Sequence, residues 1–227
     1  VPTCRIDIER EVDLIEEICR LHGFDQVPAT LPMARVFSEK LTPYQDLQRT
    51  TRDLLVSEGM HEIVTFSFIA PDAADKLLLV ADDPRRSCVA LCNPIAAEQS
   101  VMRTTLAANL LDVCARNLNF KNVDLQLFEM RRVYQCSPGQ EMPHEPVICA
   151  GVMTGAAEQS LWCHADRQID FFDVKGRIEL LFAKLGIAKV TWDGAVKEPF
   201  FHPGKCCGIR IGDTVVGALG ELHPQVL

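Results

Sequence analysis

The order of helical and extended patterns constrains the fold of this chain more than any other feature. Apolar residues recur at helical spacing in some segments and form strand-like runs in others. The expected helices cover residues 12–22, 42–59, 102–118 and 173–185, and the expected strands cover 61–70, 123–134, 146–154, the region around 190, 208–211 and 214–219. Because several strands follow one another without an intervening helix, the pattern lacks parallel βαβ alternation. We predict an α+β fold on a largely antiparallel sheet.

Glycine and proline divide the chain into a small first unit and a large second one. Gly23 is suited to end the first helix because glycine tolerates positive φ. Thr42 followed by Pro43 is a favourable helix start. The prolines between them disfavour a helix or a central strand, which predicts a linker over 28–41 between units 1–27 and 42–227. The turn at 212–213 predicts a hairpin. Because the chain opens without methionine or a secretory leader, we expect a piece of a longer polypeptide.

Composition restricts the class of protein. The net charge is −8, and the longest basic runs are pairs such as Arg85-Arg86, which disfavours a stand-alone nucleic-acid-binding module. No apolar run is long enough to cross a bilayer, so we expect no membrane partner. The ten cysteines contain no Cys-x-x-Cys pair. We expect reduced thiols in a cytoplasmic protein, with neither a disulfide framework nor a zinc site.

Acidic residues gather around the start of the first helix, at Asp7, Glu9, Asp13, Glu16 and Glu17. The last three share one face of the expected helix, separate from the apolar stripe of Leu14, Ile18 and Leu21, for which we predict burial. Such carboxylates suit Mg²⁺, which takes oxygen ligands. They also complement the positive end of a helix dipole and solvate an exposed face. Spacing alone leaves both interpretations open.

Short sequence blocks are spread over nearly the whole chain. The blocks are Arg5-x-Asp7-Ile8, Asp13-Leu14-Ile15-Glu16-Glu17-Ile18-x-Arg20, Gly23-Phe24-Asp25, Asn93-Pro94, Arg103-Thr104-Thr105-Leu106, Leu127-Phe128-Glu129, Asp170-Phe171-Phe172-Asp173-Val174-Lys175-Gly176, His202-Pro203-Gly204 and Gly217-Ala218-Leu219-Gly220-Glu221-Leu222-His223-Pro224. In content, order and spacing they resemble the β subunit of bacterial phenylalanyl-tRNA synthetases. Each block alone is weak evidence for this family, whereas all of them together are specific to it.

The resemblance implies a class II synthetase-like antiparallel sheet flanked by helices over 42–227, without catalytic residues of its own. Residues 1–27 would be the closing half of a small acidic metal-binding domain. The implied partner is the catalytic α subunit, in an (αβ)₂ enzyme that joins phenylalanine to its tRNA with ATP and Mg²⁺. ATP would be bound only through the α subunit, and tRNA mainly through regions outside 1–227.

The residues themselves favour loss of catalysis. Amino-acid activation needs arginines that balance triphosphate charge, and the late class II motif should carry Glu-Arg. This chain has Glu221-Leu222 followed by His223-Pro224. An autonomous ATP-dependent class II ligase is the alternative, which the missing arginine disfavours. The remaining candidates for nucleotide contact are Arg103, Arg131 and Arg132; we favour an inter-subunit ion pair or a solvated strand edge for them.

The resemblance assigns Mg²⁺ to Asp7, Asp13, Glu16 and Glu17, near the boundary with the α subunit and with further ligands from it. Three positions depart from the family. Arg131 stands in place of a usual glycine, Lys205-Cys206-Cys207 follows His202-Pro203-Gly204, and Cys4 replaces an aromatic residue. None of these departures touches the four carboxylates. We expect structural roles for the six histidines.

Overall fold

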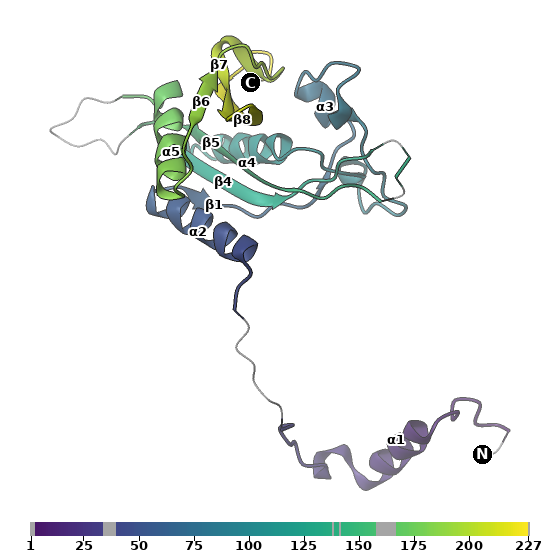
Figure 1. Ribbon diagram of the computed structural model, residues 1–227. Coiled ribbons are helices and arrows are strands. Elements are labelled where there is room, and N and C mark those ends of the chain that lie inside the picture. The colour runs from purple at the N-terminus through teal and green to yellow at the C-terminus, as the bar shows by residue number, and fades with distance from the viewer. Residues whose placement is uncertain (1–2, 34–39, 138, 141, 158–166, 227) are drawn as a thin grey trace. The chain divides into compact units, whose positions relative to one another are not determined.

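The computed structural model describes residues 3–33, 40–137, 139–140, 142–157 and 167–226. The chain divides into two units, Val1–Leu41 and Thr42–Leu227. The first contains helix α1 (Glu11–His22) and the 3₁₀ turn η1 (Phe24–Gln26) (Figure 1). The helix expected at 12–22 is confirmed. Part of the predicted linker, residues 34–39, lies outside the described residues.

The predicted burial of the α1 apolar stripe is wrong. Leu14, Ile18 and Leu21 are 47%, 66% and 79% exposed, and no residue of α1 is buried. Periodicity does place these side chains on one face of the helix. Within this unit the stripe therefore stays largely exposed.

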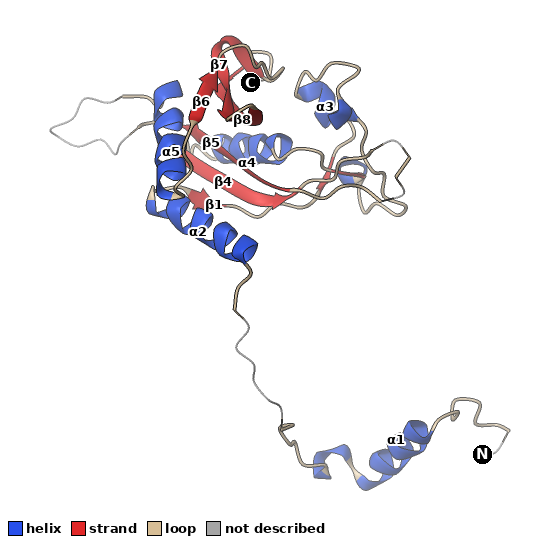
Figure 2. Cartoon of the chain, in the orientation of Figure 1, coloured by secondary structure: helices blue, strands red, loops and turns tan. Residues whose placement is uncertain are grey.

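The second unit mixes helices and strands along its whole length (Figure 2). Its helices are α2 (Pro43–Ser57), α3 (Ala73–Lys76), α4 (Ala107–Asn119) and α5 (Phe171–Lys184), with 3₁₀ turns η2 (Pro84–Arg86) and η3 (Ala97–Gln99). Its strands are β1 (His61–Glu62), β2 (Phe68–Ile69), β3 (Val101–Met102), β4 (Leu125–Arg132), β5 (Val147–Thr154), β6 (Val190–Asp193), β7 (Phe201–Ile211) and β8 (Thr214–Leu222). None of the described helices is long and apolar enough to cross a membrane.

The strands form three small sheets, with orders β1-β4-β5, β2-β3 and β6-β7-β8. Only β1 and β4 run parallel among these neighbours; every other pair is antiparallel. The predicted α+β class is therefore confirmed. Strands β7 and β8 meet across Gly212, whose φ is +59°, as the predicted hairpin requires.

Strand β4 lies at the centre of the core because helices pack on both of its faces. Leu125 and Leu127 join Leu106 and Leu110 at α4 in one buried cluster. Phe128 points to the opposite face and packs with Leu55 of α2. Figure 1 shows β4 running between these two helices. The sequence of a strand that is covered on both faces is typically a nearly continuous run of apolar residues. A charged residue within such a strand needs a partner inside the protein.

Several expected elements begin or end elsewhere. β7 begins at Phe201 and not at 208, and β8 ends at Leu222 and not at 219. The strand expected at 61–70 is interrupted, because only 61–62 and 68–69 pair as strands and Thr65 between them is bound to the Glu129 carboxylate. The helix expected from residue 102 begins at Ala107, because Met102 pairs with Phe68 in β3 and the N–H of Arg103 donates to the carbonyl of Ser67.

Helix α5 begins at Phe171, two residues before the predicted start, because Asp170 caps it. The Asp170 carboxylate accepts hydrogen bonds from the backbone N–H groups of Phe172 (2.7 Å) and Asp173 (3.2 Å). In turn, the Asp173 carboxylate accepts a hydrogen bond from the backbone N–H of Asp170 at 2.8 Å, which completes a capping box. The apolar side chains Val174 and Ile178 then pack on the β6-β7-β8 sheet.

Candidate functional site

The acidic segment of the first unit is organised by an arginine. The guanidinium of Arg5 donates to both carboxylate oxygens of Asp7, at 3.0 Å from Nε and 2.7 Å from Nη2. The same Nη2 donates to Glu17 at 2.9 Å, and Arg20 donates to the other oxygen of Glu17 at 2.8 Å. Two of the four carboxylates predicted to bind Mg²⁺ are therefore already hydrogen-bonded to guanidinium groups.

The remaining two carboxylates are placed differently. Asp13 accepts hydrogen bonds from the backbone N–H groups of Glu9 (2.9 Å) and Arg10 (2.7 Å), as part of the α1 capping box. Glu16 is exposed on the helix surface. Within the described residues no three acidic, histidine or cysteine side chains are arranged to hold a metal ion. The carboxylates have the right chemistry for Mg²⁺ but do not converge, and the metal assignment stays a prediction.

Arg5 also sets the protonation of this segment. Its hydrogen bond lowers the pKa of the Asp7 carboxyl, with a smaller contribution from backbone hydrogen bonding. It likewise lowers the pKa of Glu17, with Arg20 adding to the effect. Both carboxyls are held in the charged form by guanidinium groups of the same segment.

In the second unit, the most buried charged groups form a network around Arg103. Its side chain is 1% exposed, and Nη1 lies 3.0 Å from Oε1 of Glu129, a residue of β4 that is completely buried. Nη1 also donates to Thr65 (2.9 Å), and Nε donates to the carbonyl of Arg132 (3.0 Å). Thr65 donates to Glu129 through its hydroxyl (2.7 Å) and its backbone N–H (3.1 Å). The charges are paired within the chain, as buried charges must be.

This network explains the interruption between β1 and β2. The backbone N–H of Thr65 bonds to a side-chain carboxylate instead of a strand carbonyl. The carbonyl of Phe66 accepts from the Asn109 amide at 3.2 Å, and the carbonyl of Ser67 accepts from the Arg103 N–H at 2.9 Å. The segment between β1 and β2 is therefore held partly by side chains, Glu129 and Asn109, and partly by the backbone of Arg103.

The three arginines considered as nucleotide contacts are neighbours in the fold, since Arg103 donates to the carbonyl of Arg132, but their side chains have different surroundings. Arg103 is enclosed in an ion pair inside the chain, which differs both from a nucleotide contact and from the inter-subunit pair that we favoured. Arg132 is exposed and pairs with Glu145 at 2.9 Å, which fits the solvated-edge interpretation. Arg131 is half-buried, with a long 3.5 Å contact to the carbonyl of Met130.

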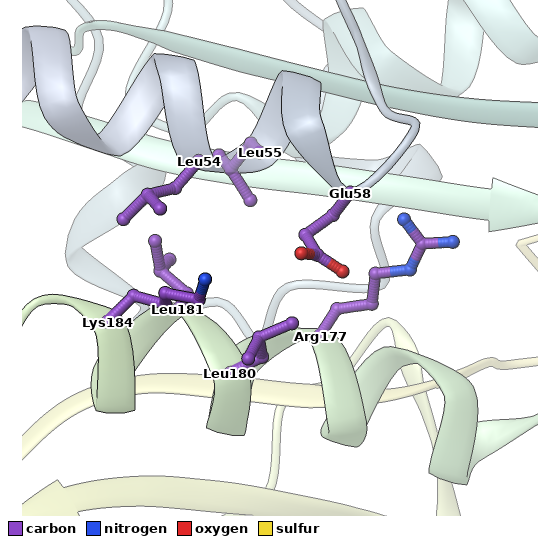
Figure 3. A pocket seen from close by; sticks show the side chains of 7 residues that line it. All are labelled: Leu54, Leu55, Glu58, Arg177, Leu180, Leu181 and Lys184. Atoms are coloured by element: carbon purple, nitrogen blue, oxygen red, sulfur yellow. The ribbon is translucent and has the colours of Figure 1, made fainter.

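The hollows of the second unit are small. One, of about 190 Å³ including open space, lies between α2 and α5; Figure 3 shows Leu54, Leu55, Leu180 and Leu181 facing one another there, with Glu58 and Arg177 at one end. A second, of about 250 Å³, lies beside Arg85, Cys88 and Thr104. Neither reaches the roughly 300 Å³ at which small-molecule pockets usually begin. Arg85 is itself neutralised by Asp83 and Glu198, at 2.8 and 2.7 Å.

The late motif leads into a turn. β8 ends at Leu222, the N–H of His223 donates to the carbonyl of Phe200, and Glu221 pairs with Lys205 on β7. His202 lies in β7, where its Nδ1 accepts the N–H of Gly204 at 3.1 Å. Nine cysteines are free thiols in the described residues, whereas Cys163 and His164 lie outside them.

Sequence reasoning missed the partners of the charged groups. Arg5 was identified only as part of a motif, and Thr65 and Asn109 only as positions in expected elements. Glu129 carried a detectable signal, because it lies between the apolar residues Phe128 and Met130 of an expected strand, and a buried carboxylate there requires a polar or cationic partner. Nothing in local spacing indicates that the cation comes from Arg103.

Two known structures with a similar fold are pyrrolysyl-tRNA synthetases by their titles. A pyrrolysyl tRNA synthetase, PylSc of Desulfitobacterium hafniense, superposes with a TM-score of 0.53 at 14% identity, covering 90% of this chain and 60% of that chain. Another pyrrolysyl-tRNA synthetase structure from the same organism gives 0.54 at 15% identity, covering 90% and 63%. At these identities the likeness defines the fold alone, which is the class II synthetase fold.

Sequence comparisons define the family within that fold. The model of the phenylalanyl tRNA synthetase beta chain CLM domain matches residues 27–227, and the tRNA synthetase B5 domain model matches residues 1–24. Phenylalanine–tRNA ligase beta subunits are 51% identical in Geobacter metallireducens and 47% identical in Geobacter sulfurreducens, each over 100% of this chain. The chain belongs to the phenylalanyl-tRNA synthetase β-chain family, as its motifs predicted. It spans 28% of the length of each of these relatives.

Proposed function

We propose that this chain serves as the non-catalytic core of a phenylalanine–tRNA ligase β subunit. It assembles with the α subunit in an (αβ)₂ enzyme that attaches phenylalanine to its tRNA, with ATP bound by the α subunit. Family membership over 27–227 supports the β-subunit role. One observation supports the scaffold role. Arg103 lies inside the class II-like core, and its guanidinium is already bound to the Glu129 carboxylate and to the backbone carbonyl of Arg132.

The alternative, an autonomous ATP-dependent class II ligase, needs cations directed at a triphosphate. The arginine absent from Glu221-Leu222, the enclosure of Arg103 and the exposed pairing of Arg132 weigh against it. A nucleic-acid-binding module would need clustered basic residues, and the chain carries a net charge of −8. tRNA contact is assigned to regions outside residues 1–227, and the place of action is the cytoplasm.

We assign Mg²⁺ to the carboxylates Asp7, Asp13, Glu16 and Glu17 in the assembled enzyme, with further ligands from the α subunit. Oxygen donors suit the ion. The domain roles follow the same division: residues 1–27 carry the acidic segment, 28–41 form the linker and 42–227 form the core.

The discriminating experiment is ATP–pyrophosphate exchange with phenylalanine, together with co-elution of the chain and the α subunit in gel filtration. We expect no exchange by the chain alone and a complex with the α subunit. Exchange by the isolated chain would establish the autonomous ligase instead. An unfolded chain is the control for nonspecific capture by the α subunit and should not co-elute. Separate elution of the folded chain and the α subunit would contradict the scaffold role.

A further inference from the structure

Two of the carboxylates assigned to Mg²⁺, Asp7 and Glu17, are bound to guanidinium groups of the chain itself. A divalent cation needs two or more anionic oxygens directed at one point. In the first unit, the point between Asp7 and Glu17 is taken by the Arg5 guanidinium, at 2.7 and 2.9 Å from their oxygens. The cation that bridges these two residues is therefore part of the chain.

We propose that Arg5 is an internal counter-cation that competes with the divalent ion for Asp7 and Glu17. The inference rests on the Mg²⁺ assignment in the proposed function. The guanidinium binds Asp7 through two nitrogens and reaches Glu17 across twelve residues of chain, so it joins the segment before α1 to the helix itself. Arg5 and a metal ion cannot both occupy this position.

The arrangement makes divalent binding conditional. Arg5 is 38% exposed, and Asp7 and Glu17 are 59% and 27% exposed, so water screens each pair and the guanidinium can be displaced. Asp13 does not compete for Arg5, because its carboxylate is bound to two backbone N–H groups. Mg²⁺ binds tightly only where a partner or a substitution draws Arg5 away, which couples the metal to assembly.

The test uses Mn²⁺ as a paramagnetic probe, with the 227-residue chain and its backbone amide signals in α1 as the readout. Arg5→Met removes the competing charge, and Arg49→Met is the matched control, because Arg49 contributes one exposed positive charge on α2. We expect Arg5→Met to bind Mn²⁺ at α1 about tenfold more tightly than the wild type, from the loss of two exposed pairs. Arg5→Lys should be intermediate, and Arg49→Met should match the wild type.

The outcomes separate the two proposals. Saturable Mn²⁺ binding at α1 with equal affinity in the wild type and Arg5→Met would overturn the role of Arg5 and leave the metal assignment standing. Weaker binding in Arg5→Met would also overturn it, since Arg5 would then organise the ligands. Absence of saturable broadening at α1 in every variant would overturn this inference, because removal of Arg5 would then not open the site, and would leave standing the assignment in the assembled enzyme, where the α subunit adds ligands. The helical circular dichroism of each variant checks that α1 is intact.

Discussion

At the scale of single residues, the buried pair of Arg103 and Glu129 makes the strongest demand on the fold. Both charges are removed from water, and each depends on the other and on Thr65 for compensation. Removing one member of such a pair leaves the other as an uncompensated buried charge. The stability of the second unit therefore depends on this contact far more than on any of its exposed ion pairs.

We predict that Glu129→Gln lowers the free energy of unfolding by about 3 to 5 kcal/mol, because it strands the Arg103 guanidinium in the core. Urea denaturation followed by circular dichroism measures the change. The double variant Arg103→Met/Glu129→Leu should lose less than half as much, since it removes both charges together. If the double variant is less stable than Glu129→Gln, the electrostatic explanation is wrong and side-chain shape dominates.

The residue scale is also where the sequence was least informative. The candidates Asp7 and Glu17 were recognised by residue type and spacing, but the identity of their partner depends on a chain reversal that spacing does not record. Glu129 and Thr65 are 64 positions apart. Contacts of this range follow from the complete topology, whereas the helical and strand patterns report only local periodicity.

At the scale of elements, the start of α5 depends on its reciprocal cap. We predict that Asp170→Ala lowers stability by about 1 kcal/mol, because it removes the acceptor for two N–H groups of the first turn. Thermal denaturation measures the effect. Asp53→Ala, which removes an exposed carboxylate from α2, is the control and should change the midpoint far less.

The same cap predicts a dependence on acid. Hydrogen bonds from Arg167 lower the pKa of Asp173 from 3.8 to about 2. A carboxyl whose pKa falls on folding stabilises the protein above its unfolded pKa and loses that contribution as the pH falls through its folded pKa. The contribution of Asp173 is thus complete above pH 3.8 and declines toward pH 2. The stability difference between the wild type and Asp173→Asn should shrink over this window, and a constant difference would contradict the assignment.

Elements were predicted well where local pattern and local capping agree. The β4–β5 pair, the turn between β7 and β8 and the bodies of α1, α2 and α5 match the expected segments, whereas β7 begins at Phe201 and not at 208. The failure at 61–70 occurs where the Glu129 carboxylate takes the N–H of Thr65, and the failure at the start of α4 occurs where residues 101–103 pair with β2. Tertiary hydrogen bonds there override strand and helix propensity.

At the scale of the whole molecule, every buried residue of the described chain lies in the second unit. We predict that the fragment 42–227 keeps its melting midpoint within about 2 °C of the full chain, a shift that corresponds to about 1 kcal/mol or less. Differential scanning calorimetry of both proteins is the measurement. A substantially lower midpoint for the fragment would mean that residues 1–41 stabilise the core.

The enclosure of Arg103 has a consequence for how this branch of the fold can change over generations. Releasing the Arg103 guanidinium for any other anion would first require freeing it from the Glu129 carboxylate. Either substitution alone costs about 3 to 5 kcal/mol, a large part of the roughly 5–15 kcal/mol free energy of unfolding of a typical domain. We therefore expect positions 103 and 129 to change together in related sequences rather than one at a time.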